Sequence, residues 1–245
     1  MRKRRTSGQI SLFGQDSNSF PDTSLSKGFS SSLNEGDKHT INIATALIRS
    51  DDSYSNHSRF LLLERLLSEL DDKVSIIVLP GGFFKIETLE KVEIASIEES
   101  ICNLLKRSNK TAIVCFGIDT NNEELGVAIS NKGIEAFCEK FYYHDRIIPS
   151  KGNIGLWGYQ RYFVFKRQNF YLAVCYDSKG IYDLPLPKEN NVSFILNLIH
   201  AFYPKGDGMS GDSSFARKLM LGASKYWECP IIGATLFVHR DVPTN

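Results

Sequence analysis

The chain has 245 residues, of which 42% are hydrophobic and 23% are charged, and its formal net charge is +1. This composition is typical of a globular protein, and so small a net charge gives no overall field to attract nucleic acid or a membrane surface. No apolar run approaches the roughly 18 residues that cross a bilayer, so we expect no membrane partner.

The cysteines and histidines argue against a disulfide framework and against a metal site. The five cysteines are odd in number and scattered, without a Cys-x-x-Cys pair, and the five histidines show no metal-ligand spacing. Such cysteine usage is typical of a reducing compartment. We therefore predict a cytoplasmic protein with no metal and no cofactor.

Residues 1–38 are rich in Ser, Gly, Asn and Asp and lack sustained periodicity. We expect them to form a disordered tail, followed by one folded domain over residues 39–245. The simplest interpretation of the tail is a flexible segment without a function of its own.

A pentapeptide within the tail supports a second interpretation. Gln9-Ile10-Ser11-Leu12-Phe13, between two glycines, resembles the short peptide by which bacterial replication and repair proteins dock on the DNA sliding clamp. In that interpretation Leu12 and Phe13 enter an apolar pocket while Gln9 fixes the register by hydrogen bonds. A sliding clamp is therefore one expected partner.

The first half of the domain alternates strands and helices. Strands are predicted at residues 40–48, 74–79 and 112–118, helices at residues 60–70 and 93–107, and a hairpin at residues 126–130 and 134–142. The strand at 74–79 ends at Pro80-Gly81-Gly82, a turn that brings backbone close to whatever lies beyond the strand.

The second half continues the pattern after a glycine-rich loop at residues 151–158. We expect strands at residues 162–166, 170–175, 192–198 and 230–238, and a helix at residues 213–227. Alternating strands and helices with an added hairpin predict an α/β protein built on a layered sheet.

The run Phe-Tyr-Leu-Ala-Val-Cys-Tyr-Asp at residues 170–177 delivers one thiol, that of Cys175, to the end of a buried strand. Many α/β folds present a nucleophile at such a place. An isolated cysteine in this setting is more often a small buried hydrophobic residue. The order of the surrounding segments is therefore needed to distinguish a nucleophile from a structural cysteine.

That order resembles the nitrilase, or carbon–nitrogen hydrolase, superfamily over residues 40–238. The segments that carry the resemblance are "Ile-Ile-Val-Leu-Pro-Gly-Gly-Phe-Phe", the hairpin that ends in "Phe-Cys-Glu-Lys-Phe-Tyr", "Leu-Ala-Val-Cys-Tyr-Asp", "Phe-Ile-Leu-Asn-Leu" and the segment "Phe-Ala-Arg-Lys-Leu-Met-Leu-Gly-Ala". The resemblance implies a four-layer α-β-β-α sandwich, commonly paired into homodimers.

The resemblance also implies a chemistry and a set of site residues. Cys175 would attack an amide or nitrile carbon and form a thioester, which water then hydrolyses. Lys140 and the backbone N–H of Tyr176 would stabilise the oxyanion. The ligand implied is a small molecule with an amide or carbonyl group. On spacing alone, Lys140 would instead be a solvated hairpin lysine.

The sequence departs from the family at the general base. The family places a Glu after the Pro of the first segment, and this chain has Gly81 there. The family also has a supporting Glu between the lysine and the cysteine. This chain has no Glu between Lys140 and Cys175. Candidate replacements for the base, chosen for their positions near the expected site, are Glu87, Asp145 and Asp177.

Two interpretations follow. Losing the base removes a contribution of about 10²–10⁴-fold and favours a nitrilase-like protein that has lost turnover and acts as a binding or interaction module. The alternative is an active thiol amidohydrolase with a relocated base. We expect substrate selectivity to lie in residues 119–125 and 151–159, and we expect Gly81→Glu to raise activity if the rest of the site is intact.

Overall fold

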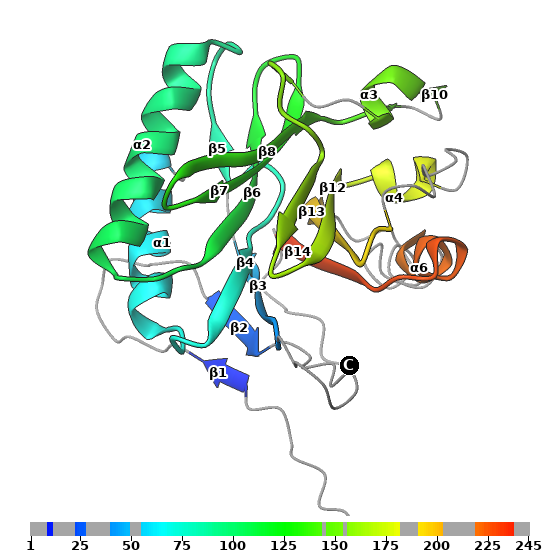
Figure 1. Ribbon diagram of the computed structural model, residues 1–245. Helices are drawn as coiled ribbons and strands as arrows, with labels where there is room; N and C mark the ends of the chain where they lie inside the picture. Colours follow the sequence, from blue (N-terminus) through cyan, green and yellow to red (C-terminus); the bar gives the residue numbers. More distant parts are fainter. Residues whose placement is uncertain are drawn as a thin grey trace, which may run out of the picture.

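The computed structural model describes residues 9–11, 23–27, 40–49, 55–143, 146–153, 156–181, 191–202 and 219–237. Figure 1 shows four layers: helices α1 and α2, two layers of β-sheet, and a layer that contains helices α4 and α6. The predicted α-β-β-α arrangement is confirmed.

The main strands occur close to where the sequence predicts them. They are β3 (Asn42–Arg49), β4 (Val74–Val78), β6 (Ile113–Asp119), β7 (Glu124–Ser130), β8 (Gly133–Glu139), β11 (Tyr162–Phe165), β12 (Gln168–Val174), β13 (Phe194–Phe202) and β14 (Ile231–Phe237). The helices named above are α1 (Asn56–Glu69), α2 (Lys91–Arg107), α4 (Asp177–Gly180) and α6 (Leu221–Trp227). Short elements that the sequence does not predict are β5 (Phe84–Lys85), β9 (Tyr142–Tyr143), β10 (Arg146–Ile147) and α3 (Pro149–Asn153).

The two sheet layers are joined at β3. Hydrogen bonds connect the strands in the order β11-β12-β13-β14-β3-β4-β6-β7-β8. Residues 42–45 of β3 pair with β4, whereas residues 47–49 pair with β14. One strand therefore belongs to both layers, and the sheet folds back on itself there.

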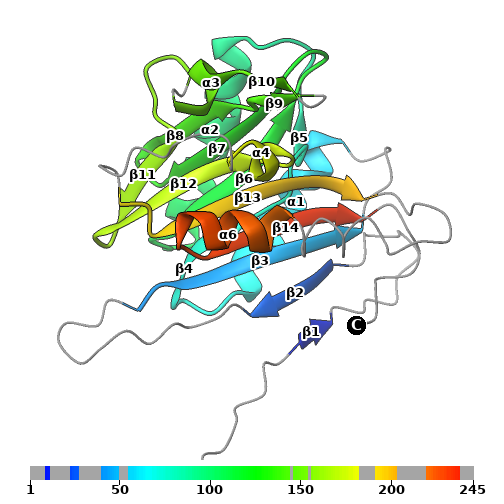
Figure 2. The same ribbon diagram turned by 90° about the vertical axis from the view of Figure 1, so that its right-hand side faces the viewer.

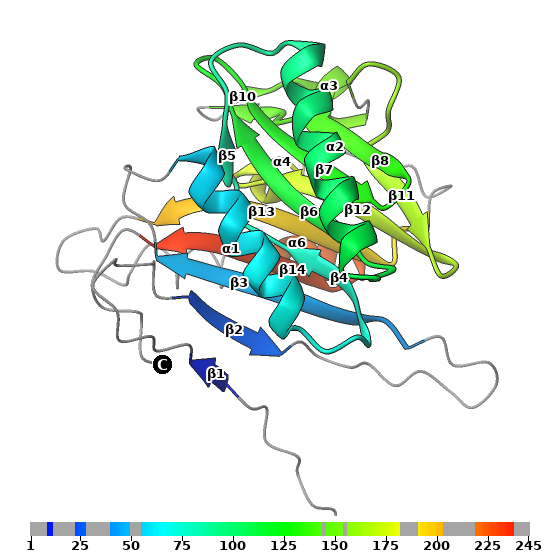
Figure 3. The same ribbon diagram turned by 90° about the vertical axis from the view of Figure 1, so that its left-hand side faces the viewer.

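Alternation along the strands fills the spaces between layers. In β4, Ile76 and Val78 face the partner sheet, while Ile77 packs with the helices. Helix α1 supplies Leu63, Leu66 and Leu67 to that helix-facing core, in agreement with their helical spacing. Figure 3 shows α1 and α2 covering one outer face, and Figure 2 shows α4 and α6 on the opposite face.

Strand direction brings several strand ends to one edge of the sandwich. Strands β3, β4, β6, β12, β13 and β14 run parallel to their neighbours among this set. Strand β8 is antiparallel to β7, which is antiparallel to β6, so β8 ends at the same edge as β6. In open α/β sheets, ligands bind beyond the carboxyl ends of the parallel strands.

The predicted tail and the predicted helix at residues 213–227 are only partly described by the structure. Within residues 1–38, Gln9–Ser11 forms β1 and Thr23–Lys27 forms β2; β1 pairs with β2, and β2 pairs with β3. The other tail residues lie outside the described part. Of the helix predicted at residues 213–227, Leu221–Trp227 is helical, and residues 213–218 are not described.

The described part contains no helix that is both long enough and apolar enough to span a membrane. All five cysteines of the chain lie in described residues, and each is a buried free thiol.

Candidate active site

Cys175 occupies a strained turn at the end of β12. Its φ is +50°, a left-handed conformation that costs energy for a residue with a side chain. Its N–H donates to the carbonyl of Leu198 at 2.9 Å. Its own carbonyl accepts from Ser178 Oγ at 3.1 Å and Asn197 Nδ2 at 3.2 Å. These contacts fix a sharp strand-to-helix turn of the kind that presents the nucleophile in α/β-hydrolases.

Lys140 follows the last residue of β8. Its Nζ donates to both carboxylate oxygens of Glu124, at 2.8 and 2.7 Å. Its backbone N–H also donates to the Glu124 carbonyl at 2.8 Å, and the ammonium lies 5.2 Å from the ring centre of Tyr143. Only 9% of the Lys140 side chain is exposed. Lys140 is therefore a buried lysine paired with Glu124 rather than a solvated hairpin lysine.

The ring of His200, on β13, lies directly over Gly81. A β-carbon built on Gly81 would be 2.7 Å from both Cε1 and Nδ1 of this ring, and 2.8 Å from the carbonyl oxygen of Leu198. Real β-carbons essentially never approach other atoms so closely. The imidazole therefore takes the space in which a side chain at position 81 would begin.

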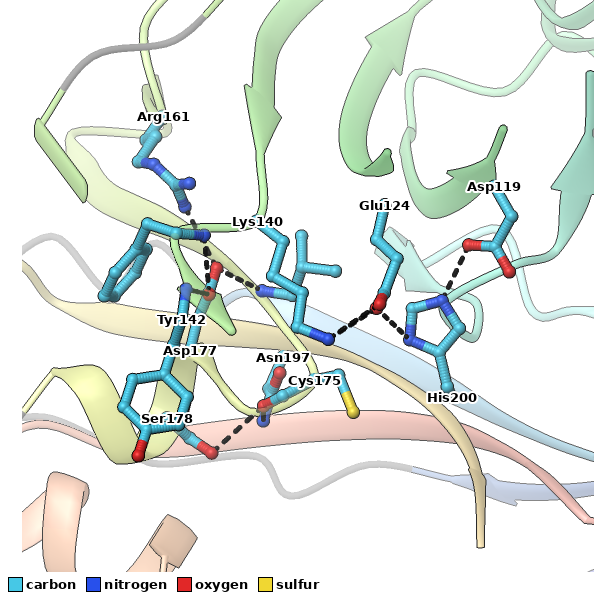
Figure 4. A network of polar contacts seen from close by, with 12 residues as sticks. Asp119, Glu124, Lys140, Tyr142, Arg161, Cys175, Asp177, Ser178, Asn197 and His200 are labelled. Carbon is cyan, nitrogen blue, oxygen red and sulfur yellow. Dashed lines mark hydrogen bonds and ion pairs between the residues drawn. The ribbon is translucent and has the colours of Figure 1, made fainter. Parts of the chain in front are cut away.

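Two carboxylates face the His200 ring, one on each nitrogen. Nε2 donates to Asp119 Oδ1 at 2.7 Å, and Nδ1 lies 3.2 Å from Glu124 Oε2. The second contact is an ion pair without hydrogen-bond alignment, since Nδ1 is buried and has no hydrogen-bond partner among the described residues. Figure 4 shows Glu124 between Lys140 and His200, with the Cys175 sulfur nearby.

The charge state of His200 depends on the same neighbours. Burial alone would lower the pKa of His200, but interactions with the side chains of Asp119 and Cys175 raise it to about 10. The imidazole is therefore held as a cation next to the sulfur at neutral pH. A cation beside a cysteine favours the reactive thiolate.

The arrangement contains the parts that thiol-dependent acyl transfer needs. Asp119 orients the His200 ring through Nε2, and Nδ1 can exchange a proton with the Cys175 sulfur. Catalytic triads combine a nucleophile, a base and an orienting carboxylate in the same way. Lys140 is a second, buried cation that Glu124 holds near the same sulfur. A cation fixed before the reaction can stabilise a developing oxyanion.

Among known proteins, the chain matches solved structures but no family model or curated sequence. A mutant amidase of the nitrilase superfamily from Nesterenkonia AN1 aligns with a TM-score of 0.58 at 7% identity, over 78% of this chain and 76% of that one. The chain has the nitrilase-superfamily fold.

Two further solved structures agree on this fold. An amidase from Nesterenkonia sp. gives a TM-score of 0.57 at 7% identity over 78% of this chain and 75% of that one. A glutamine-dependent NAD(+) synthetase from Cytophaga hutchinsonii gives 0.55 at 14% identity, over 80% of this chain but 36% of the synthetase. Identities this low show the nitrilase fold alone.

Within the nitrilase fold, the structure brings some of the predicted site residues together. Cys175 and Lys140 lie around the same carboxylate–imidazole cluster, with Tyr176 directly after Cys175; the role of the Tyr176 N–H stays a prediction. Gly81 lies under the His200 ring. Residue Asp145 is outside the described part.

The other proposed replacements for the base do not fit that role. Glu87 is exposed, and no hydrogen bond or ion pair joins its side chain to the described residues of the site. Asp177 is fully buried, and its two oxygens accept from Arg161 and from three backbone N–H groups. Its oxygens are therefore committed to holding the turn.

Sequence reasoning missed Asp119, Glu124 and His200. Asp119 is the last residue of β6 and Glu124 the first of β7, while His200 lies in the last part of β13, so all three are near the edge where the carboxyl ends of the parallel strands meet. That position was the available signal. Residues 119–125 supply Asp119 and Glu124 to the cluster; their role in selectivity stays a prediction.

The tail peptide remains a prediction. Gln9 lies in β1, whereas Leu12 and Phe13 lie outside the described residues, so the structure gives no evidence on docking to a sliding clamp.

Proposed function

We propose that this protein is a thiol-dependent hydrolase of carbon–nitrogen bonds, with Cys175 as nucleophile and His200 as a relocated general base. In this proposal Asp119 orients His200, and Lys140, held by Glu124, stabilises the oxyanion. The substrate class is a small amide or nitrile.

The observation that carries the proposal is the position of the His200 ring over Gly81. The resemblance to nitrilases assigns the general base to the side chain at position 81, which is a glycine in this chain. An imidazole from a different strand fills the space where that side chain would start, with its Nε2 held 2.7 Å from Asp119 Oδ1. In this proposal an imidazole from β13 takes the role that the resemblance assigns to a glutamate at position 81.

Acylation follows from these positions. The Cys175 thiolate attacks the amide carbon, and the carbonyl electron pair moves to oxygen, beside the Lys140 ammonium. When the tetrahedral intermediate collapses, the carbon–nitrogen bond breaks and the His200 imidazolium gives its proton to the departing nitrogen. Ammonia leaves, and a thioester and a neutral imidazole remain.

Deacylation uses the same groups in reverse. Neutral His200 takes a proton from water as the water oxygen attacks the thioester carbon. The second tetrahedral intermediate again places its oxyanion beside Lys140. Breaking the carbon–sulfur bond releases the carboxylic acid and restores the thiolate and the imidazolium.

The loss of turnover expected from Gly81 now has less support. That interpretation, a binding or interaction module, rested on the absence of a base at position 81 and of a supporting Glu between Lys140 and Cys175 in the sequence. His200 is a candidate for the missing base, and Glu124 is a candidate for the missing supporting carboxylate. An active amidohydrolase is therefore the stronger proposal. Retained binding without turnover remains the outcome to be tested against it.

The first experiment measures iodoacetamide labelling of each cysteine by peptide mass spectrometry. Burial raises the pKa of Cys138 and Cys229 to about 11, and it also raises the pKa of Cys102 and Cys115. These four thiols are internal controls. We expect Cys175 to react at pH 7 far faster than all of them, and to slow in His200→Gln.

The second experiment measures ammonia release from a panel of amides. The panel begins with butyramide and acrylamide, which are bound in structures of the Nesterenkonia amidase, and with glutamine. We expect activity that Cys175→Ala abolishes and that His200→Gln lowers by about 10²–10⁴-fold. If Cys175 reacts no faster than the control thiols and no amide is hydrolysed, the proposal is wrong.

A further inference from the structure

Arg161 is a buried cation that binds backbone near both parts of the site. It precedes β11 and its side chain is 0% exposed. Nη2 donates to the carbonyl of Glu139, the residue before Lys140. Nη1 donates to the carbonyl of Leu172 in β12 at 3.1 Å. One planar guanidinium therefore joins the end of β8 to the strand that carries the nucleophile.

Asp177, the ion-pair partner of Arg161, makes the complementary contacts. Its Oδ1 accepts from the N–H groups of Phe141 and Tyr142, at 2.9 and 3.0 Å. Its Oδ2 accepts from the N–H of Val174 at 3.0 Å and from Arg161 Nη1 at 3.4 Å. Asp177 thus holds the residues just after Lys140 and the residue just before Cys175.

The partners of Asp177 indicate its ionisation state. Burial favours the neutral acid and raises the pKa of Asp177, whereas Arg161 and the three backbone N–H groups act in the opposite direction. All four partners are donors, and a protonated carboxyl group would need an acceptor for its own proton. The geometry therefore fits a carboxylate paired with Arg161.

The ion pair brackets both functional residues along the chain. Lys140 lies between Glu139, held through its carbonyl by Arg161, and Phe141, held through its N–H by Asp177. Cys175 lies between Val174 and Asp177 itself. The pair therefore links the backbone on either side of Lys140 to the backbone on either side of Cys175.

We propose that Arg161 and Asp177 are positioning residues that set the placement of Lys140 relative to Cys175. This inference rests on the proposed function, in which Lys140 and Cys175 act on the same carbonyl group. Neither Arg161 nor Asp177 touches the substrate in this proposal. Their effect is on kcat and on thiol reactivity, since small misplacements of reacting groups are costly.

The test uses the full-length chain with Arg161→Lys and Asp177→Asn. Lys keeps the charge of Arg161 but cannot reach Glu139, Leu172 and Asp177 with one ammonium. Asn keeps the shape of Asp177 but loses the ion pair. We expect the alkylation rate of Cys175 at pH 7 and kcat to fall roughly tenfold to 100-fold, with KM within about twofold of wild type.

Lys110→Met is the control for the general loss of stability that follows when a buried ion pair away from the site is broken. Lys110 is also buried, and its Nζ donates to Leu70 O at 2.9 Å and Asp72 Oδ1 at 2.8 Å. Neither partner belongs to the site. We expect this variant to lose stability while Cys175 keeps the wild-type rate and pH profile of alkylation.

The outcomes separate the two proposals. If wild-type Cys175 reacts no faster than the other thiols, the proposed function fails. If wild-type Cys175 reacts fast and both site variants keep that rate and its pH profile, the positioning role alone is overturned.

A measurement on the wild type covers the case in which the variants do not fold. Since one carboxylate accepts from Phe141, Tyr142 and Val174, we expect these amides to exchange their hydrogens in one common opening event. Independent exchange of Val174 and the other two amides would overturn the coupling.

Discussion

The His200 ring and the α-carbon of Gly81 are packed so closely that no β-carbon fits between them: a β-carbon at position 81 would lie 2.7 Å from Cε1 and Nδ1 of the ring. The glycine at position 81 is therefore a requirement of the site. A side chain at position 81 and the His200 ring in its present place exclude each other.

Gly81→Glu is predicted to lower activity, the opposite of the effect expected from the sequence alone. The new side chain must displace the His200 ring and also meets the Leu198 carbonyl oxygen at 2.8 Å. Overpacking of this kind costs about 1–3 kcal/mol. Amide hydrolysis and Cys175 alkylation should both fall, and urea unfolding should show lower stability.

A double-mutant cycle with Gly81→Ala is the control for this prediction. In the His200→Ala background the ring is gone and only the contact with Leu198 remains, so Gly81→Ala should destabilise the protein less than it does in wild type. Equal destabilisation in both backgrounds would show that the ring does not occupy this space.

The stability of the protein should depend on pH through His200. Its pKa rises from 6.5 to about 10 on folding, mainly because Asp119 and Cys175 oppose the effect of burial. A group whose pKa is raised in the folded state stabilises fully below its unfolded pKa and loses that effect as pH rises through the folded pKa.

The expected result is a difference between wild type and His200→Gln in the free energy of unfolding. This difference should be constant below about pH 6.5, decline as pH increases, and level off above about pH 10. Chemical unfolding at a series of pH values measures it. The ionisable groups that face His200 are Asp119, Glu124 and Cys175. If the difference in unfolding free energy did not change with pH across this window, His200 would not be a cation in the folded protein.

Glu124→Gln should impair catalysis because Glu124 faces both cations of the site. Its oxygens accept from Lys140 Nζ at 2.8 and 2.7 Å and lie near His200 Nδ1. Hydrogen bonds to charged groups contribute about 1.5–3 kcal/mol, so kcat should fall by roughly 10-fold to 100-fold. We expect a smaller change in KM.

Glu123→Gln is the control for this prediction. The neighbouring carboxylate accepts from Thr120 within the β6–β7 turn, whereas the acidic partner of Lys140 is Glu124 and those of His200 are Asp119 and Glu124. Steady-state kinetics on an amide substrate should leave Glu123→Gln near wild type. Similar losses in both variants would assign the effect to the turn rather than to the carboxylate between the cations.

The sequence predicts most of the fold because buried strands leave a strong local signal. The apolar runs at residues 74–79, 112–118 and 170–175 correspond to β4, β6 and β12, with Cys175 at the end of the last. Short elements such as β5 and α3 are missed, since a few residues carry too little periodicity to distinguish them from loops.

The sequence by itself determined where most strands lie along the chain, the layered α/β class, and the position of Cys175 at the end of a strand, because these follow from local hydrophobic pattern. Lys140 is singled out only by the resemblance to a family. Only the tertiary structure decided that the His200 ring occupies the space beside the Gly81 α-carbon and that Glu124 lies between Lys140 and His200. Asp119 and His200 are 81 positions apart in the chain. They meet because β6 and β13, in different sheet layers, end at the same edge of the sandwich, and no local pattern records that proximity.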